Sequence, residues 1–563
     1  MKLSMALKVI TDIDPQPSRK TVSADKKGVS MKLRTRRLRV LVLLVAALAI
    51  LGGSATAQNV KPKIVTIAMT NAWDTMMPVN TNSNYGLLVY DQIYDRLVVT
   101  KADGSFAPRL AKSWSVNASS TAITFILNEK ATWHDGKPVT AQDVVFTAQL
   151  YSNPAVKALA RYRLNYFAGT DDSGAETSPG SIAVKAEGDY KVTFTLKKAI
   201  FADTVIDQWA TAFFVIPKHI FQGKTPAEIN APTLWAKPVG SGPFKYEREI
   251  TGERMELVAN KNYFLGAPDF DRLVIRIMPS ASLLSGLISG EVDIIAGGAM
   301  GSISLDDWPT AQKQANLVTE SIPTLNYQTL IINTQQPYMT QRVRQAFNMA
   351  INRKILVDAL LRGQGVALMT PISPASPYFN QKLKDIPYDP ARAAQILKEE
   401  KFPFDKELVF YVPSGNIARE RTAVLIEQDF EKLGVKVRIQ TVDFPTLMNN
   451  MRSGTHDFGI IGSGGTLDPA ESREMVSPTS TVNFSRLTST LLTDIIDEGA
   501  AKLTFATRKP YFDKYQEMVA ELSHMPYLYT TNALMAYNKR LSNVSAVDFS
   551  RLNWRAWEWK VNN

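Results

Sequence analysis

Residues 133–146 read WHDGKPVTAQDVVF, and this stretch predicts a tight turn that leads directly into a helix. Asp135 and Gly136 favour the turn, because glycine accepts a positive φ and aspartate can bond its own backbone. Thr140 and Asp143 have the spacing of a capping box, in which a hydroxyl and a carboxylate satisfy the first amides of a helix. The apolar run VVF then starts the helix itself.

The composition indicates a large globular protein without cysteine chemistry. At 563 residues the chain is too long for one core, so we expect two or three domains. Apolar residues make up 45% of the chain, which suits well-packed cores, and there is no cysteine. The lack of cysteine excludes disulfides, thiolate catalysis, zinc–thiolate sites and a lipid anchor on cysteine.

The first 57 residues have the pattern of a secretory signal peptide. Lysines and arginines lead into an apolar stretch of twelve residues, 40–51, and ATA at 55–57 offers small residues for cleavage. The apolar stretch is short for a membrane span. Met31 opens the pattern, so residues 1–30 are either an over-long start assignment or a long native leader. We expect residues 1–57 to be removed and the mature protein to be periplasmic, soluble and without a lipid anchor.

The positive charge of the chain is concentrated in this leader. The whole chain carries a formal net charge of +11, of which residues 1–57 contribute +8 and residues 58–563 only +3. The high isoelectric point is therefore no sign of a nucleic-acid partner, and we expect none.

The mature chain alternates predicted strands and helices. Strands are expected where apolar residues alternate, and amphipathic helices where they recur every three or four residues. We expect strands at 64–69, 123–127, 192–196, 255–258, 273–277 and 435–439, and helices at 85–97, 343–351 and 423–433. The strand–helix–strand order of the second half predicts an α/β lobe.

Seven segments, in a consistent order, resemble the bacterial extracellular solute-binding proteins of family 5, the peptide and nickel receptors of ABC importers. The stretch at 133–146 resembles the family's HDG-x-P-x-T-A-x-D-V-x-F motif. The other matching segments are 90–114, PVGSGPF at 238–244, SGEVD at 289–293, QRVRQAFNMAIN at 341–352, YDP at 388–390 and LDP at 467–469. Together they cover nearly all of residues 60–535.

The resemblance implies an α/β, two-lobed periplasmic-binding-protein fold of class II, with an extra subdomain inserted in lobe one. Lobe one would comprise residues 58–316 and 527–563, with the insertion at about 96–238, and lobe two would comprise residues 317–526. The implied function is capture of a small solute, such as a peptide, a modified peptide or a related organic solute, by closure of the cleft between the lobes. A monomer without cofactor or catalysis would then deliver the solute to an ABC permease in the inner membrane.

Other functions on the same fold remain open. The ligand could be an oligosaccharide or a metal chelate, and the role could be chemosensory or chaperone-like. A secreted hydrolase is disfavoured, because the sequence has no G-x-S-x-G motif, no zinc-binding helix and no cysteine. The four histidines are far apart in sequence, so we expect no metal site, and His134 and the GSGP segment at 240–243 are interpreted as structural.

One glycine departs from the family pattern at the expected ligand anchor. Peptide-binding members hold the α-amine of the ligand with a carboxylate four residues before the proline of the late D-P turn. That proline is Pro469 here, and the residue four positions earlier is Gly465. A buried ammonium without a partner would cost several kcal/mol, so we expect a ligand without an ammonium at this place. The alternatives are a shift of one or two residues in the glycine-rich loop, or an anchor from elsewhere.

Seven further residues are candidate ligand contacts. Arg419 could bind a carboxylate through two parallel hydrogen bonds, or could be a solvated arginine at a helix start. Trp73 could stack on a sugar or an apolar group, or pack in the core. The remaining candidates are Asn326, Tyr327, Asn416, Ser463 and Thr466. We expect packing roles for the tryptophans near the C-terminus, Trp554, Trp557 and Trp559.

Overall fold

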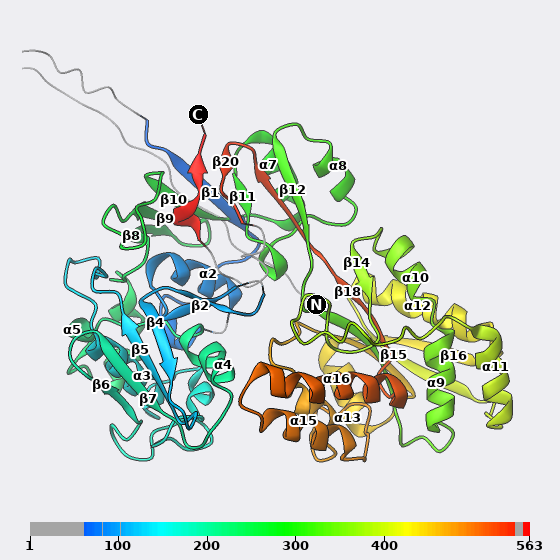
Figure 1. Ribbon diagram of the computed structural model, residues 1–563. Helices are drawn as coiled ribbons and strands as arrows, with labels where there is room; N and C mark the ends of the chain where they lie inside the picture. Colours follow the sequence, from blue (N-terminus) through cyan, green and yellow to red (C-terminus); the bar gives the residue numbers. More distant parts are fainter. Residues whose placement is uncertain (1–60, 82, 102, 546–554, 563) are drawn as a thin grey trace, which may run out of the picture. The chain divides into compact units, whose positions relative to one another are not determined.

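The computed structural model divides the chain into two compact units, Met1–Lys61 and Pro62–Asn563. The described residues are 61–81, 83–101, 103–545 and 555–562. The predicted signal peptide, residues 1–57, and Trp554 therefore lie outside the described residues. The second unit combines helices with several sheets (Figure 1). Within the described ranges, no helix has both the length and the apolar character that crossing a bilayer requires.

The largest sheet has the first predicted strand at its centre. Its seven strands lie in the order β12-β19-β11-β1-β10-β9-β8. Their bounds are β1 Ile64–Met69, β8 Phe244–Ile250, β9 Arg254–Ala259, β10 Arg272–Ile277, β11 Ile294–Ile295, β12 Leu317–Ile322 and β19 Ala533–Asn538. Strand β1 runs parallel to both of its neighbours, β10 and β11. Such a strand is covered on both faces, and its residues from Val65 to Met69 are almost all apolar and buried.

The helix after the first strand is shorter than the sequence predicts. Helix α2 spans Asn84–Ile93, whereas the pattern predicts 85–97. The GSGP turn packs against the C-terminal end of this helix and prevents its continuation. The contact is so close that a Cβ on Gly240 would lie 1.7 Å from the carbonyl oxygen of Ile93. The amide of Gly242 also donates to that carbonyl at 2.9 Å. The turn thus has the structural role predicted for it, and the chain leaves the helix where the turn docks.

The stretch at 133–146 forms the predicted turn and helix. Gly136 has a φ of +89°, as the tight turn requires. The amide and hydroxyl of Thr140 donate to the carboxylate of Asp143 at 2.8 and 3.1 Å, and helix α3 begins directly after this capping box, at Ala141–Ser152.

Helix α3 contacts a four-stranded antiparallel sheet in the order β4-β5-β7-β6. Its strands are β4 Ala111–Val116, β5 Ala122–Leu127, β6 Val184–Ala186 and β7 Lys191–Thr195, and β2 Val98–Thr100 pairs with β3 Phe106–Pro108 beside it. The short helices of this region are α4 Ala202–Val205, η3 Ile206–Ala210, α5 Lys218–Phe221 and α6 Pro226–Ile229. The strict alternation predicted for β5 is confirmed, and its buried Phe125 meets Phe194 of β7 with ring centroids 5.8 Å apart.

The second large sheet has six strands in the order β14-β18-β13-β17-β15-β16. Their bounds are β13 Tyr327–Ile332, β14 Gly365–Ala367, β15 Glu407–Pro413, β16 Lys436–Val442, β17 Phe458–Ser463 and β18 Tyr527–Thr531. Along β13, Leu330 and Ile332 belong to one hydrophobic cluster and Ile331 to another. This alternation shows that the sheet is covered on both faces, as its apolar strands lead one to expect.

Two groups of helices cover these two faces (Figure 1). One hydrophobic cluster contains residues of α9 Gln341–Ala350, α11 Pro390–Glu399 and α12 Ile417–Glu431. The other contains residues of α13 Phe444–Ser453, α15 Leu491–Ala500 and α16 Phe505–Leu522. The helices predicted at 343–351 and 423–433 are thereby confirmed, and Gly434 follows the second one with a φ of +83°. Apart from short 3-10 helices, the other described elements are α7 Leu283–Ser289, α8 Trp308–Gln312, α10 Arg353–Ile355, η7 Leu356–Leu360, α14 Arg473–Val476, β20 Leu541–Ser542 and β21 Lys560–Val561.

The chain crosses between the two large sheets twice, from β12 to β13 and from β18 to β19. Asn326 ties the two crossings together. Its Oδ1 accepts from the amide of Thr531 at 3.0 Å, and its Nδ2 donates to the carbonyl of Thr531 at 3.3 Å. The lobe limits predicted at 316/317 and 526/527 remain a proposal. If each lobe is defined by the strands of its sheet, the lobe limits lie within the two crossings, at 322–327 and 531–533.

Candidate functional site

A half-buried arginine lies where two antiparallel strands of the six-stranded sheet meet a helix start. Gln328 of β13 pairs with Gly462 of β17. Asn416 caps helix α12 by accepting from the amide of Arg419 at 3.1 Å, which fixes the first turn of this helix. The Nε of Arg419 donates to Oε1 of Gln328 at 2.7 Å. We call Gln328, Arg419, Gly462 and Ser463 the Arg419 group.

Gly462 leaves the space that the guanidinium of Arg419 occupies. A Cβ at position 462 would lie 2.6 Å from Nη2 of Arg419 and 2.4 Å from Nε2 of Gln328. Burial lowers the pKa of Arg419, but a guanidinium keeps its charge at any physiological pH. In the described part of the chain, no carboxylate forms an ion pair with it. The Arg419 group therefore presents a partly desolvated cation whose counter-charge the protein does not supply.

Two other predicted residues lie at the same ends of β13 and β17. Tyr327 and Ser463 face each other in the register of the two strands. The Tyr327 side chain is buried; its hydroxyl contacts Sδ of Met475 at 3.0 Å, and its ring packs against Tyr527 with centroids 5.1 Å apart. Ser463 accepts from the amide of Gly465 at 3.3 Å. The structure thus brings Tyr327, Asn416, Arg419 and Ser463 together, with Tyr327 mostly in the core.

The glycine at position 465 is required by the path of the backbone. Its φ is +75°, and a Cβ there would lie 1.9 Å from the carbonyl oxygen of Leu325. Any side chain at this position would collide with the β12–β13 crossing. The Thr466 hydroxyl bonds the carbonyl of Asp468 at 3.0 Å, within the same loop. A carboxylate side chain therefore has no room at this position.

The other two predicted residues have partners elsewhere in the protein. The amide of Asn326 is occupied by the crossing strands, as described above. Trp73 follows β1, is buried, and hydrogen-bonds the side chain of Glu249. Among the hydrogen bonds of the described residues, none joins Trp73 or Asn326 to Arg419.

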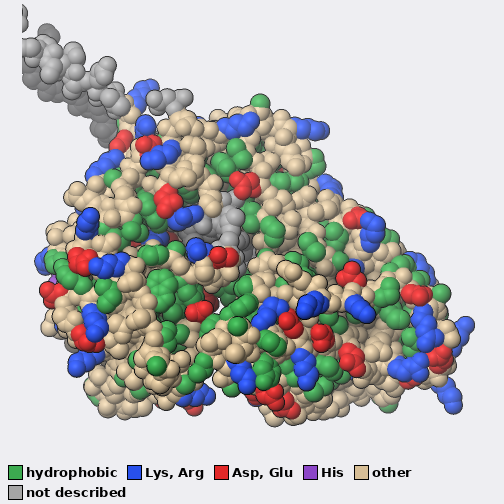
Figure 2. All heavy atoms as spheres, in the orientation of Figure 1, with side chains coloured by type: hydrophobic (Ala, Val, Ile, Leu, Met, Phe, Trp, Pro, Cys, Tyr) green, Lys and Arg blue, Asp and Glu red, His purple; other side chains and the backbone are tan. Residues whose placement is uncertain are grey.

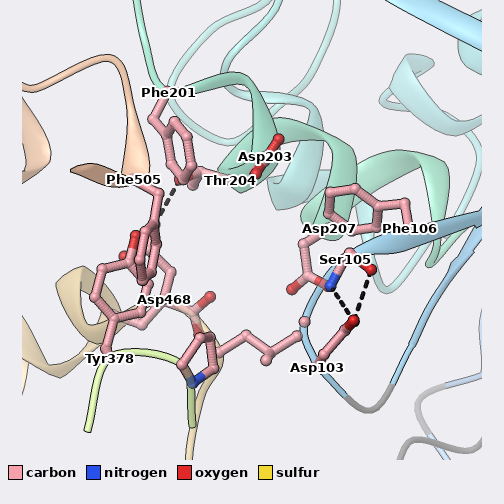
Figure 3. A pocket seen from close by; sticks show the side chains of 14 residues that line it. Asp103, Ser105, Phe106, Phe201, Asp203, Thr204, Asp207, Tyr378, Asp468 and Phe505 are labelled. Carbon is pink, nitrogen blue, oxygen red and sulfur yellow. Dashed lines mark hydrogen bonds between the residues drawn. The ribbon is translucent and has the colours of Figure 1, made fainter. Parts of the chain in front are cut away.

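A cavity of about 290 Å³ lies between the segment 201–207 and the segment 467–471 (Figure 3). Its carboxylates are Asp103, Asp203, Asp207, Asp468 and Glu471, and its aromatic walls are Phe106, Phe201, Tyr378 and Phe505. Figure 3 shows Phe201, Tyr378 and Phe505 on one side and Asp103, Phe106 and Asp207 on the other. We call this the acidic cavity.

Two hydrogen bonds at the acidic cavity hold the buried Asp468, and a third lies at the exposed Glu471. Asp468 is buried; one oxygen accepts from the hydroxyl of Thr204 and the other from Nη2 of Arg508, both at 2.5 Å. Gln208 donates to Oε1 of Glu471 at 2.7 Å. Arg508 is also buried, with its guanidinium 4.7 Å from the ring centroid of Phe201. Side chains from segments more than 260 positions apart therefore form hydrogen bonds with each other here.

The crowding of carboxylates favours protonation at the rim of the cavity. Desolvation, together with the charges of Asp468 and Asp207, raises the pKa of Glu471 to about 7. Desolvation also raises the pKa of Asp203, against the opposing charge of Arg508. Both side chains are exposed at the rim, so solvent screens these interactions.

Within the described residues, no three His, Asp or Glu side chains come together in a way that could hold a metal ion. His134 is enclosed by the GSGP turn, where its Nε2 lies 3.0 Å from the carbonyl oxygen of Gly242, and burial lowers its pKa to about 4. It is a neutral structural histidine, as its sequence context predicts.

Sequence reasoning missed the acidic cavity and Gln328. The spacing of Asp203 and Asp207, four residues apart on one helical face, was the one local signal of this cavity. Their neighbours in the cavity, at 468–471, are remote in sequence.

Tryptophans 557 and 559 are buried, and Trp557 packs under Arg109 with 4.4 Å between guanidinium carbon and ring centroid. Their predicted packing role is confirmed.

Charged side chains of both signs are interspersed over the face seen in Figure 2. That face has no extended patch of one sign, in keeping with the small net charge of residues 58–563.

Comparison with known proteins agrees with the two-lobed architecture. The chain is 29% identical over 395 residues to heme-binding protein A of Haemophilus influenzae, covering 67% of this chain and 70% of that protein. It is 26% identical to the oligopeptide-binding protein AppA of Bacillus subtilis, covering 79% of this chain and 82% of AppA. The crystal structure of the ABC transporter substrate-binding protein CtaP of Listeria monocytogenes superposes with a TM-score of 0.78 at 24% identity, over 89% of this chain and all of CtaP.

The fold is therefore α/β and two-lobed, as the sequence predicts. The family model of the bacterial extracellular solute-binding proteins, family 5, matches residues 105–484, about two thirds of the chain. This chain is a member of the bacterial extracellular solute-binding protein family 5.

Proposed function

We propose that this protein is the substrate-binding component of an ABC importer and that its solute carries a carboxylate. The solute is enclosed when the two lobes close, its carboxylate bonds the guanidinium of Arg419, and the closed form is presented to a permease in the inner membrane. No bond of the solute is made or broken.

The observation that carries this proposal is the unmatched charge of Arg419. Among the described residues, the half-buried guanidinium has a hydrogen bond to one side chain, that of Gln328, and its other donors in the fixed fork remain available. Carboxylates match that fork bidentately, and the interaction gains strength when closure excludes water. The geometry at Gly465 adds a second criterion for the solute. Because no side chain fits at this position, none there can bind an ammonium group of the solute.

The names of both relatives agree with the first criterion, a carboxylate, and one of them also agrees with the second. The similar proteins are described as heme-binding and oligopeptide-binding. Haem and peptides differ in shape, but both carry carboxylates. Of the two, haem has no ammonium group, and neither has a peptide with a blocked N-terminus. We therefore propose amine-free or N-blocked carboxylates as the preferred solutes.

The setting of this function follows from the leader and the lobes. Residues 1–57 would direct export and be removed, leaving a monomer in the periplasm that lacks a lipid anchor. Lobe one would comprise the seven-stranded sheet with the four-stranded insertion, and lobe two the six-stranded sheet. The crossings that Asn326 ties together would be the hinge.

Thermal unfolding of the protein that starts at residue 58 tests the proposal. The panel pairs free, N-acetylated and C-amidated di- to pentapeptides and adds haem, oligosaccharides and nickel chelates. A ligand at 100 times its Kd stabilises by about 2.7 kcal/mol, which is a visible shift. Each ligand is repeated on Arg419→Gln and on the control Arg421→Gln, which removes an exposed arginine of the same helix.

We expect acetylated peptides or haem to stabilise the protein, and amidated peptides to do so poorly. Loss of one charged hydrogen-bond partner should weaken binding about tenfold or more in Arg419→Gln and leave Arg421→Gln unchanged. Stabilisation only by free peptides, lost on acetylation, would show that an amine anchor exists elsewhere. A response only to oligosaccharides, or equal affinities for the two variants, would contradict the proposal that the solute carries a carboxylate.

A further inference from the structure

A second cavity, on the opposite side of lobe two from the Arg419 group, is lined by neutral polar residues, two arginines and one proline. Its volume is about 330 Å³. The lining residues are Gln335, Arg452, Pro478, Ser480, Thr481, Asn483, Arg486 and Thr488. No carboxylate is among them. We call this the arginine pocket.

The arginine pocket is remote from the Arg419 group along the six-stranded sheet. Strand β13 starts at the Arg419 group with Tyr327 and ends at Ile332, and Gln335 follows. At about 3.4 Å per residue, this places Gln335 roughly 20 Å from Tyr327. Strand β17 runs the opposite way and starts beside the pocket. A ligand in the pocket would therefore not touch a solute bound at Arg419.

The fold places Arg486 at this pocket through an unusual backbone conformation. Its φ is +56°, a left-handed conformation that costs a non-glycine residue free energy. Its amide donates to the carbonyl of Asn483 at 3.0 Å, and its carbonyl accepts from Nε2 of Gln335 at 3.1 Å. Gly454 leaves room for the guanidinium, because a Cβ there would lie 2.6 Å from Nη1 of Arg486.

Arg452 brings a second positive charge to the same place. It lies in the last turn of helix α13, and its guanidinium carbon is 5.9 Å from the ring centroid of Phe484. Nη1 of Arg486 donates to the backbone carbonyl of Arg452 at 3.0 Å. Over the described residues, neither guanidinium has an ion-pair partner.

The negative end of helix α13 compensates only part of the positive charge of Arg452 and Arg486. A helix C-terminus carries a partial charge of about −0.5, and one guanidinium donor satisfies one of its free carbonyls. Two guanidiniums bring two full positive charges. The excess is uncompensated by protein groups, and the hydroxyls of Ser480, Thr481 and Thr488 line the same cavity.

We propose that the arginine pocket binds a phosphate group, either of inorganic phosphate or of an anionic lipid headgroup. Two guanidiniums supply forked donors that match a tetrahedral oxyanion, and hydroxyls can donate to its remaining oxygens. This site is separate from the solute site and its occupancy does not depend on the proposed transport function. The bound anion would also link α13 to the loop 477–488.

Isothermal titration of the mature protein with sodium phosphate at low ionic strength tests the free anion. The variant is Arg452→Gln, whose guanidinium lies beside the ring of Phe484 and has no hydrogen bond to another of the described residues. The matched control is Arg421→Gln, at another exposed arginine. Cosedimentation with phosphatidylcholine vesicles, with and without phosphatidylglycerol, tests the headgroup on the same three proteins. Arg452→Gln and Arg486→Gln are then combined, with circular dichroism as the check on folding.

Saturable binding of one phosphate per chain, weakened at least about tenfold by Arg452→Gln and unaffected by Arg421→Gln, is the expected result. Binding only to the vesicles that contain phosphatidylglycerol, with the same response to the variants, would support the proposal with the headgroup as the source. Equal binding by Arg452→Gln and Arg421→Gln, or no binding in either assay, would overturn it.

Discussion

The acidic cavity and the Arg419 group differ in how their buried charges are satisfied. In the acidic cavity, the carboxylate of Asp468 is bonded by Thr204 and Arg508, which come from two other parts of the chain. In the Arg419 group, the guanidinium has Gln328 as its side-chain partner and no carboxylate among the described residues. The Asp468–Arg508 pair is therefore satisfied within the protein, whereas the Arg419 group has donors left for a solute.

The charge balance of each region therefore indicates whether its arginine has a structural role or a binding role. A buried ion pair whose geometry is satisfied holds segments together, and removing one partner leaves a costly unpaired charge. A cation that the protein leaves unpaired contributes little to folding and gains its partner on binding. The comparison predicts opposite consequences for Arg508 and Arg419.

The largest effect is expected for Arg508→Met. It leaves the buried Asp468 without its cation, and we expect a loss of about 3–5 kcal/mol in the free energy of unfolding, measured with urea. The control is Arg473→Met, which removes an exposed pair with Asp497 and should cost less than about 1 kcal/mol. Similar losses for the two variants would mean that Arg508 is not a structural partner.

The next effect is expected for Gly465→Asp. The new side chain requires a left-handed backbone and collides with the carbonyl of Leu325, so we expect a loss of about 2–4 kcal/mol. Gly464→Asp is the matched control, because a Cβ there meets no atom within 4 Å. A stable Gly465→Asp protein that gains affinity for free peptides would show that this loop can carry the amine anchor after all.

A smaller effect on stability is expected for Arg419→Gln in the ligand-free protein. Only the hydrogen bond to Gln328 is lost, so the cost should stay below about 1.5 kcal/mol. The same urea titration in the presence of a bound solute should show a larger gap between variant and wild type. If the ligand-free cost instead equals that of Arg508→Met, the contrast between the two regions fails.

The smallest effect is expected in the pH dependence of Glu471. Its pKa rises from 4.5 to about 7 in the folded protein, so the folded state keeps a proton that the unfolded state releases. The stability from this group is complete below pH 4.5 and is lost as the pH rises through about 7. Glu471→Gln should flatten this part of the profile between pH 5 and 8, measured against wild type by urea unfolding. An unchanged profile would place the titrating group elsewhere.

Local patterns were sufficient for much of the fold. The capping box of Thr140 and Asp143, the alternation in β5 and the helical spacing in α9 are set by neighbours in sequence, and each is found as predicted. The end of α2 was predicted four residues too late, because Gly240 limits it from almost 150 positions away. A pattern of neighbours carries no sign of such a contact.

The candidate site was predictable only in part. Arg419 and Asn416 follow a recognisable strand-to-helix turn, and the structure places them at a strand end with Ser463. Asn326 was a weaker candidate for ligand contact, and its amide is bonded to Thr531 at the end of strand β18. Trp73 likewise has a partner in Glu249. Whether a polar side chain has donors to spare depends on remote partners, which single-sequence reasoning does not provide.

The sequence by itself determined the family, the order of strands and helices, and the loss of a carboxylate at position 465, because motifs, periodicity and residue identity are local properties. The tertiary structure alone decided why that position must be glycine, which charges are already paired, and where two arginines remain uncompensated. Those properties depend on the distance between atoms far apart in the chain, since electrostatic and steric energies are set by distance in space rather than by separation in sequence.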